Sequence, residues 1–247
     1  MMEYRQYAPP GHLAPWVECV WTLRGVAPEA VETILPDGRM ELVVHDANRP
    51  AGQGARFVTG QITGPVTLQP AGEMLTRGWR LRPAAAGSFL GMPASELAGQ
   101  FVPLDFLKPG PPKGPPDGAI THAVELVEAC AGNCRMDDLT RAANLSPRQL
   151  DRRFLHAVGL PPKAFARIVR FQALLTAYRA GEYTRWADLA LQCGFYDQAH
   201  LANEFRQFAG APPTEFFRAP SALALLMANF SKTAGIARAY DHLQCDY

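Results

Sequence analysis

The stretch LSPRQLDRRFLHAVGLPPKAF, residues 145–165, returns in altered form as YDQAHLANEFRQFAGAPPTEF, residues 196–216. The two copies lie about 51 residues apart and agree at the positions that constrain a backbone most. The matched positions are Leu150 with Leu201, Phe154 with Phe205, Gly159 with Gly210, and Pro161-Pro162 with Pro212-Pro213. A fixed internal period of this kind indicates one structural unit that is built twice.

Each copy has the pattern of a helix, a tight turn and a second helix. In the first copy Ser146 suits a helix N-cap, Pro147 suits the first helical position, and Gln149 completes a capping box. In the second copy Asp197 is the matching cap, and Gly194 lies where the turn needs a positive φ. The matched leucines and phenylalanines are expected to point inward, which leaves polar side chains on the outside.

Two helices joined by a short turn, with polar side chains at the start of the second, are typical of a helix-turn-helix DNA reader. A helical hairpin that touches no DNA is the alternative for a single unit. The tandem arrangement favours DNA binding, because the amphipathic run from Phe165 to Tyr178 predicts a helix that would hold both readers at a fixed separation.

The run Cys193-Gly194-Phe195-Tyr196-Asp197-Gln198-Ala199-His200-Leu201, followed by Phe205, Phe208, Gly210 and Pro213, resembles the signature of AraC/XylS-family transcription regulators. Residues 119–220 resemble the DNA-binding domain of that family. The resemblance implies an all-helical domain whose two recognition helices enter successive major grooves on one face of double-stranded DNA.

By position, the resemblance implies DNA contacts from both helices. The implied contact residues are Ser146, Pro147, Arg148, Gln149, Asp151, Arg152, Asp197, Gln198, Ala199, His200, Asn203 and Arg206. Those expected to face bases are Arg148, Asp151, Arg152, Gln198, Ala199 and Asn203, whereas Arg206 is expected to meet phosphate.

The charge pattern agrees with a nucleic-acid partner only locally. The 247 residues carry a formal net charge of +1 at pH 7, which alone does not favour DNA. Between residues 141 and 170, however, seven basic side chains accompany the single acid Asp151: Arg141, Arg148, Arg152, Arg153, Lys163, Arg167 and Arg170. Some of these are expected only to flank the core, Arg153 and Arg170 among them. The second unit carries few charges, so the two half-sites are expected to contribute unequally.

Residues 1–108 are predicted to form a mainly β domain. β-forming residues concentrate at 18–23 and 41–45, Pro36-Asp37-Gly38 is a turn, and residues 91–97 predict a brief capped helix. The predicted fold class is therefore α+β, with a mainly β sensor domain, cupin-like or related, followed by an all-α domain with two helix-turn-helix units.

Three further segments complete the predicted organisation. Residues 109–118 are rich in proline and glycine and predict a linker, residues 119–220 form the tandem helix-turn-helix domain, and residues 221–247 form a C-terminal tail.

Three N-terminal stretches resemble an uncharacterised domain that recurs in bacterial AraC-type proteins: Tyr4-Arg5-Gln6-Tyr7-Ala8-Pro9-Pro10, Leu13-Ala14-Pro15-Trp16-Val17-Glu18-Cys19 and Leu35-Pro36-Asp37-Gly38. A β module in this place resembles the sensor halves of the family, which implies effector binding or dimerisation. The candidate ligand-binding residues are Trp16, Trp21, Phe57, Trp79 and Arg80. Aromatic walls with one charged anchor suit a small organic anion, although the same side chains equally suit a core.

Other functional classes find little support in the sequence. The five cysteines include no CxxC pair, so no zinc site, other metal or cofactor is expected, although Cys130 and Cys134 leave a redox switch open. No catalytic constellation is present, and an enzyme is not expected. The alternative is a DNA-binding domain fused to an enzymatic or repair domain.

The expected partners follow from this assignment. Double-stranded DNA is the main expected partner, an unidentified small molecule is the expected effector, and RNA polymerase and a second copy of the chain are further candidates. No apolar run is long enough for a membrane span, so a cytoplasmic protein is expected.

Overall fold

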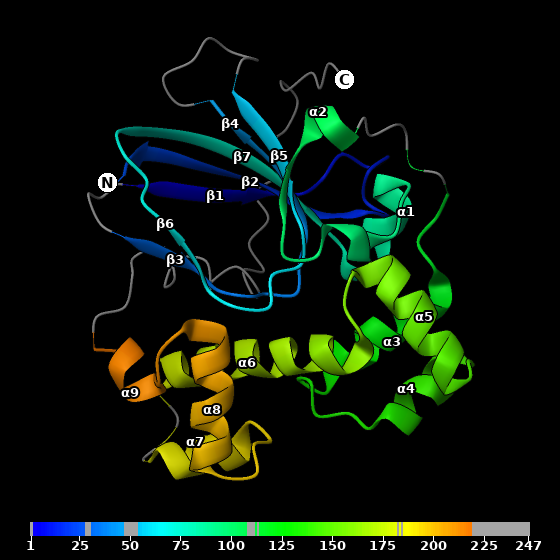
Figure 1. Ribbon diagram of the computed structural model, residues 1–247, viewed down its shortest axis with the longest axis vertical. Coiled ribbons are helices and arrows are strands. Elements are labelled where there is room, and N and C mark those ends of the chain that lie inside the picture. Colours follow the sequence, from blue (N-terminus) through cyan, green and yellow to red (C-terminus); the bar gives the residue numbers. More distant parts are fainter. Residues whose placement is uncertain are drawn as a thin grey trace.

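The computed structural model describes residues 2–27, 31–46, 54–107, 112, 114–181, 183 and 185–218. The predicted tail, 221–247, and part of the proline- and glycine-rich stretch 109–118, namely 109–111 and 113, lie outside the described residues. A β-rich N-terminal part lies against a helical C-terminal part (Figure 1). The predicted α+β class is confirmed.

The N-terminal part contains a six-stranded antiparallel sheet in the order β1-β2-β7-β4-β5-β8. Its strands are β1 (Glu3–Tyr7), β2 (Val17–Val26), β4 (Glu41–His45), β5 (Ala55–Thr59), β7 (Glu73–Leu81) and β8 (Phe101–Pro103). A separate antiparallel pair consists of β3 (Glu32–Ile34) and β6 (Val66–Leu68). The described strands thus form two sheets with a space between them.

The two faces of the large sheet carry different side chains, because successive residues of a strand point to opposite sides. On one face Val20 and Leu81 join Leu13, Phe89 and Leu97 in a buried apolar cluster. The elements over this face are η1 (Pro83–Ala85), α1 (Ala86–Leu90) and η2 (Ala94–Leu97), with α2 (Leu104–Leu107) at the sheet edge. The other face carries Cys19, Trp21 and Val43.

The brief capped helix predicted for residues 91–97 needs a correction. The structure has the 3₁₀ turn η2 there, and its N-cap residue Pro93 makes no side-chain cap hydrogen bond. Proline has no side-chain oxygen to accept from the backbone, so the segment remains a single short turn.

The C-terminal part is helical, as predicted. Its helices are α3 (Gly118–Ala129), α4 (Met136–Ala143), α5 (Pro147–Val158), α6 (Pro162–Ala180), α7 (Trp186–Gln192), α8 (Gln198–Ala209) and α9 (Pro213–Phe216). None of the described helices is long and apolar enough to cross a membrane.

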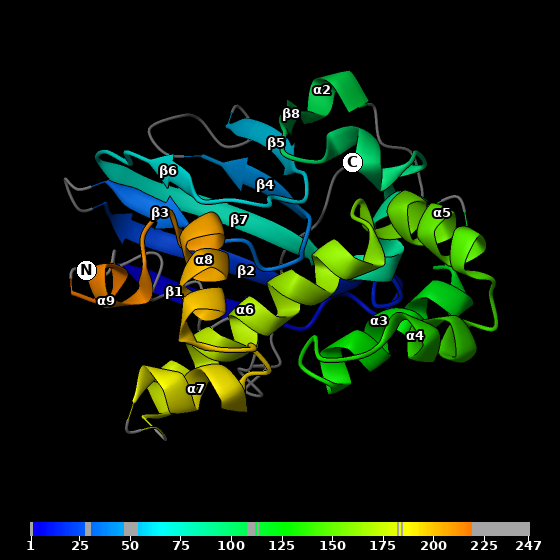
Figure 2. The same cartoon turned by 60° about the horizontal axis from the view of Figure 1, so that its bottom comes forward.

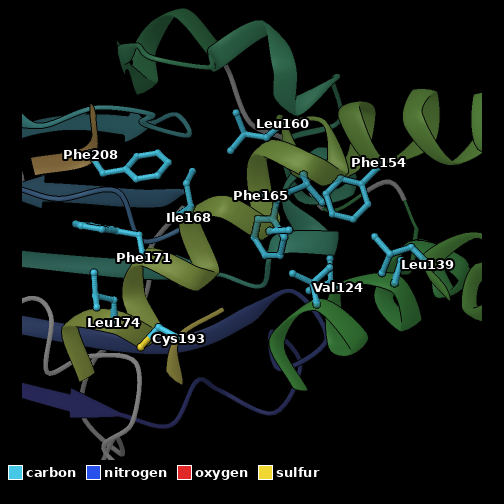
Figure 3. Close-up of a cluster of buried hydrophobic side chains, with 14 of the residues drawn as sticks. Val124, Leu139, Phe154, Leu160, Phe165, Ile168, Phe171, Leu174, Cys193 and Phe208 are labelled. Atoms are coloured by element: carbon cyan, nitrogen blue, oxygen red, sulfur yellow. The ribbon is translucent and has the colours of Figure 1, made fainter. Parts of the chain in front are cut away.

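Helix α6 is shared by the two units and realises the helix predicted from Phe165 to Tyr178. Phe165 packs against Phe154 of α5 with ring centroids 5.7 Å apart (Figure 3). Phe171 packs against Phe205 of α8 with ring centroids 5.3 Å apart. These phenylalanines are almost fully buried. Burying such large side chains stabilises a fold by about 1.5–3 kcal/mol each, so α6 anchors both units to one core.

The two parts of the chain are packed together along this core. Leu35 and Ala84 of the N-terminal part belong to the helical cluster, and a Cβ added at Gly87 would lie 2.5 Å from the carbonyl oxygen of His156 in α5. Gln172 of α6 donates from Nε2 to the carbonyl oxygen of Pro36 at 2.6 Å. The β-rich part therefore contacts both the first unit and the connecting helix.

Candidate DNA-binding interface and ligand cavity

Helix α5 begins as the sequence predicts. The backbone N–H of Gln149 donates to Ser146 Oγ at 3.4 Å, and the backbone N–H of Ser146 donates to Gln149 Oε1 at 3.0 Å, which completes the capping box. Pro147 is the first helical residue, and the helix ends at Gly159 with φ of 91°. Both ends of the first recognition helix are therefore set by local chemistry.

Helix α8 repeats this plan with a different cap. The backbone N–H of His200 donates to Asp197 Oδ1 at 2.7 Å, and the helix ends at Gly210 with φ of 82°. The predicted positive φ of Gly194 is confirmed at 77°. In the first unit a left-handed residue, Asn144 with φ of 51°, follows α4, and asparagine is among the few other residues that adopt this conformation readily.

The expected inner and outer faces of both helices are confirmed. Leu150, Phe154, Leu201 and Phe205 are buried, and Phe208 joins them. The side chains expected on the outer faces are exposed: Arg148, Gln149, Asp151 and Arg152 on α5, and Gln198, Ala199, Asn203 and Arg206 on α8. Polar side chains thus cover the solvent side of each recognition helix.

The orientation of the two helices leaves their N-terminal ends accessible. At their C-terminal ends both meet the N-terminal part: a Cβ at Gly159 would lie 3.1 Å from the Ala94 carbonyl oxygen, and one at Gly210 would lie 3.4 Å from Pro65. Their N-terminal ends lie on the side away from the large sheet (Figure 1). The two helices lie toward opposite ends of α6 (Figure 2).

The positive charges around α5 divide into side chains that pair with other described residues and side chains that do not. Arg153 donates to both carboxylate oxygens of Asp117 at 2.8 and 2.6 Å, and Arg167 donates to both oxygens of Glu204 at 2.8 and 2.6 Å. Arg170 donates to the Gly132 carbonyl oxygen at 3.3 Å. These three arginines act within the fold, as was expected of Arg153 and Arg170.

The cations that remain lie on the outer surface. Arg141 forms an exposed ion pair with Asp138 at 2.5 Å. Arg148, Arg152 and Lys163 are exposed, and none of them forms a hydrogen bond or ion pair with a residue that the structure describes. They border one shallow concavity together with Ser146, Gln149, Asp151, Leu155, Pro161 and Met136.

Asp117 links the start of α3 to the first recognition helix. Partial burial pushes its pKa upward, but the hydrogen bonds from Arg153 and from the backbone N–H groups of Ile120 and Ala119 outweigh this and hold the pKa below its ordinary value. The carboxylate therefore stays ionised, caps α3 and holds Arg153 on the inner side of α5.

Some predicted contact residues have structural partners of their own. The backbone N–H of Tyr196 donates to Nδ1 of His200 at 3.2 Å, and the His200 ring meets the edge of Phe195. Nη1 of Arg206 donates to Oδ1 of Asn203 at 3.4 Å. His200 thus stabilises the turn, as Ser146, Gln149 and Asp197 stabilise the helix starts.

Two exposed residues were absent from the predicted contacts. Lys163, at the start of α6, borders the same concavity as Arg148 and Arg152. Tyr196, directly before the cap of α8, is 86% exposed. The sequence held a signal for Lys163, because a cation in the first turn of a helix opposes the helix dipole and needs another reason to be there.

A cavity of about 490 Å³ lies between the large sheet and the β3–β6 pair. Its walls are mainly apolar and include Trp21, Leu23, Val43, Phe57, Met74 and Phe101. The charged or titratable residues that line it are Asp37, Arg39, Glu41 and His45. Its size and lining are typical of a site for a small organic molecule.

The five predicted ligand-binding residues do not form one pocket. Trp21 and Phe57 line the cavity, whereas Trp16 and Trp79 pack against the core on the opposite face of the sheet. The physical reason is strand alternation, because the neighbours Trp79 and Arg80 must point to opposite faces. Trp16 also donates from Nε1 to the carbonyl oxygen of Gly114 at 3.1 Å.

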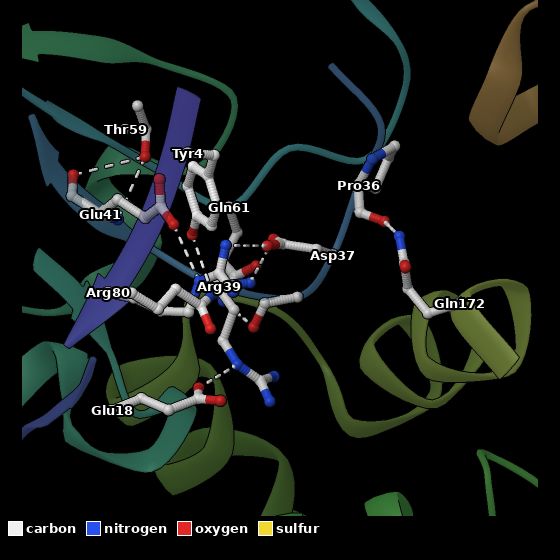
Figure 4. Close-up of polar contacts among 12 residues, drawn as sticks. Tyr4, Glu18, Pro36, Asp37, Arg39, Glu41, Thr59, Gln61, Arg80 and Gln172 are labelled. Atoms are coloured by element: carbon white, nitrogen blue, oxygen red, sulfur yellow. Dashed lines mark hydrogen bonds and ion pairs between the residues drawn. The ribbon is translucent and has the colours of Figure 1, made fainter. Parts of the chain in front are cut away.

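Arg80 is not a free anchor for an anion. Its Nε donates to Glu41 Oε1 at 2.9 Å, its Nη2 lies 3.5 Å from Asp37 Oδ2, and its side chain is only 3% exposed (Figure 4). Both carboxylates line the cavity, and they already balance the guanidinium. The expectation of a small organic anion therefore loses its physical basis.

The thiols named in the sequence analysis are partly buried. Burial raises the pKa of Cys134 to about 12, so this side chain holds little reactive thiolate at neutral pH. Among the residues that the structure describes, no three His, Cys, Asp or Glu side chains are grouped to hold a metal ion.

The repeated units, their caps and their outward polar faces define a tandem helix-turn-helix domain, a class of fold that reads the DNA major groove. Residues 139–219 match a family model described as a helix-turn-helix domain, and residues 5–103 match a domain of unknown function, DUF6597. Together with the signature around Gly194, these matches support an AraC/XylS-family regulator.

Comparisons with individual proteins agree with this assignment. The chain is 30% identical over 107 residues to the HTH-type transcriptional regulator MtrA of Neisseria gonorrhoeae, which is 42% of this chain and 35% of that protein. The chain thus spans about a third of the length of the curated relative that it matches.

Two solved structures are similar in part. A probable AraC family transcriptional regulator from Rhodopseudomonas palustris CGA009 is 28% identical, with a TM-score of 0.36, over 44% of this chain and 96% of that one. ToxT from Vibrio cholerae O395 is 10% identical, with a TM-score of 0.41, over 88% of this chain and 96% of that one. Both TM-scores are too low to add to the family assignment.

Proposed function

We propose that this chain is a one-component transcription regulator that binds double-stranded DNA with α5 and α8 and responds to a small molecule in the cavity. The observation that carries the proposal is the repetition of one capped, outward-facing helix on either side of α6. Arg148 and Arg152 give the first of these helices positive charge that no described residue pairs with. Exposed arginines are common on protein surfaces, so it is their place on a repeated, capped helix that favours a nucleic-acid partner.

The proposed roles of the contact residues follow from hydrogen-bonding chemistry. An arginine can donate two hydrogen bonds to O6 and N7 of guanine, which suits Arg148 and Arg152. Glutamine and asparagine can pair with adenine, which suits Gln198 and Asn203. Arg206 and Lys163 are proposed to contact phosphates, and the remaining predicted residues, Ser146, Pro147, Gln149, Asp151, Asp197, Ala199 and His200, are proposed to hold the helix starts against the groove.

The turn at residues 36–39 is the proposed route from the cavity to the DNA readers. Asp37 and Arg39 line the cavity on one side of the turn. On the other side the Pro36 carbonyl accepts from Gln172, which itself lines the cavity. A ligand that displaces this turn would shift α6 relative to the large sheet and so move the two recognition helices that α6 carries.

Gly38 lets the 36–39 turn pack closely against α6. Its φ is 76°, and an added Cβ would lie 2.9 Å from Cε2 of Phe165. A left-handed glycine therefore lets the turn reach the buried face of α6, where a larger residue would meet the ring that anchors the first unit.

The proposal is tested with the purified full chain and a random duplex library. After selection of a bound sequence, fluorescence anisotropy measures its affinity between 50 and 200 mM salt, conditions under which about six phosphate contacts would cost about 10³-fold in affinity. We expect specific binding with a steep salt dependence. Failure to select any sequence, or an affinity that salt does not change, would overturn the DNA-binding function.

A further inference from the structure

We propose that the cavity takes a hydrophobic amine that is protonated at neutral pH, with its ammonium beside Asp37 and Glu41 and its apolar body against Trp21 and Phe57. The inference deepens the proposed function and rests on it for the effector role alone, since binding of the amine does not require DNA.

Two carboxylates among the described residues line the polar end of the cavity, and both lie beside one guanidinium. Asp37 and Glu41 share the guanidinium of Arg80, at 3.5 and 2.9 Å (Figure 4). Arg39 also lines the cavity, but its guanidinium lies 2.7 Å from Glu18 and 2.7 Å from Glu128. The positive charge of Arg39 is thus held by two carboxylates outside the cavity lining, and an ammonium would add a second positive charge beside Asp37 and Glu41.

Glu41 is the carboxylate that would gain most from such a ligand. It is only 7% exposed, and burial raises its pKa despite the nearby Arg80. Its ionised form is thus costly at this buried position. A cation placed beside it would favour that form, which is a source of binding energy that a neutral or anionic ligand lacks.

The apolar walls suit the rest of the molecule. The rings of Phe57 and Phe101 lie 6.1 Å apart. The indole of Trp21 on β2 lines the cavity on the other side of β7 from β4, the strand that carries Glu41. Aromatic faces also attract cations, most strongly when water is excluded. A carboxylate ligand of the same shape would instead face Asp37 and Glu41, where like charges repel.

The test uses three probes that share one aromatic body. Isothermal titration calorimetry of the full chain at pH 7 compares 2-naphthylethylamine, 2-naphthylethanol and 2-naphthylacetate. We expect the amine to bind about ten-fold or more tightly than the acetate, a difference of about 1.4 kcal/mol, with the alcohol between them. Equal or tighter binding of the acetate, or no binding of the amine, would overturn the inference.

Matched variants locate the charge that selects the amine. In the wild-type chain, Oδ1 of Asp37 accepts a hydrogen bond from the backbone N–H of Arg39 at 2.9 Å. Asp37→Asn keeps an oxygen that can accept this bond, so the variant is expected to fold. It should remove most of the preference for the amine, as should Glu41→Gln. Glu73→Gln is the control, because Glu73 is exposed on β7 outside the cavity lining. An amine preference that survives both cavity variants contradicts the proposal.

DNA binding by the same samples separates the two proposals. Amine binding that leaves the affinity for the selected DNA unchanged would support the ligand class and overturn its effector role. Specific DNA binding by a chain that does not prefer the amine would overturn the ligand class and leave the DNA-binding function standing.

Discussion

Two adjacent arginines on α5 should give opposite phenotypes when each is replaced by alanine. Arg152 is exposed and unpaired within the described part of the chain, whereas Arg153 donates two hydrogen bonds to Asp117. Both changes remove the same charge from the same helix. The two variants therefore have the same total charge. A difference between them in DNA affinity or stability reports where each side chain points.

The expected magnitudes follow from these surroundings. If Arg152 pairs with a guanine, its loss costs about 1–3 kcal/mol, or about 5- to 150-fold in affinity for the selected DNA. The Arg153 pair is 39% and 26% exposed at its two side chains, so solvent weakens it, and Arg153→Ala should lower the free energy of unfolding by about 0.5–1 kcal/mol.

Fluorescence anisotropy with the selected duplex and urea unfolding measure the two effects on each variant. Arg152→Ala should weaken DNA binding, relax the preference at one guanine and leave unfolding unchanged. Arg153→Ala should do the reverse. Equal losses of affinity would show that α5 contributes only diffuse charge, and a loss confined to Arg153→Ala would refute the assigned orientation of the helix.

Three further predictions concern a helix cap, an ion pair and the cavity wall. Asp197→Ala should cost about 1 kcal/mol of stability in urea unfolding, whereas Asp197→Asn, which can still cap, should cost little; equal costs would contradict the capping role. The lowered pKa of Asp117 means that its ion pair stabilises the fold above about pH 3.9 and is lost as the pH falls through the folded pKa, so the stability gap to Asp117→Asn should shrink between pH 5 and pH 3. A gap that stays constant over this range would count against the pair. Gly78→Ala should abolish amine binding, because the added Cβ would lie 2.2 Å from the Trp21 indole and force it out of place; unchanged calorimetry would refute this packing.

The helix-turn-helix units could be predicted in detail because their signals are local. A cap, a first-turn proline and a left-handed glycine each act within a few residues, and all appear twice in the chain. The interior of α6 was also predictable, because a helix that serves two cores shows apolar residues at helical spacing. Asn144 was missed because asparagine signals a left-handed turn less strongly than glycine.

The cavity could not be assembled from the sequence in the same way. Its walls come from strands far apart in the chain, so their order in the sheet had to be known before any side chains could be placed together. The alternation of side chains along a strand nevertheless places Trp79 and Arg80 on opposite faces of the sheet. From the sequence alone, these two residues could therefore not belong to one pocket. The carboxylates that neutralise Arg80 come from the 36–39 turn and from β4, which composition alone cannot place.

The packing between the two parts of the chain was likewise invisible in the sequence. A proline- and glycine-rich stretch predicts a linker between separate domains, yet Leu35 and Gly38 reach the core beside α6. Long-range contacts of this kind leave no local pattern. They are also what makes the proposed route from ligand to DNA physically short.

The central claim is that α5 and α8 enter two major-groove segments on one face of the same duplex. Methylation protection of guanine N7 on the selected DNA tests it most directly, because that atom lies in the major groove. The account predicts two clusters of protected guanines about one helical turn apart, about 10–10.5 base pairs, with the cluster nearest α5 lost in Arg152→Ala. A single cluster, or two clusters about half a turn apart on opposite faces, would contradict it.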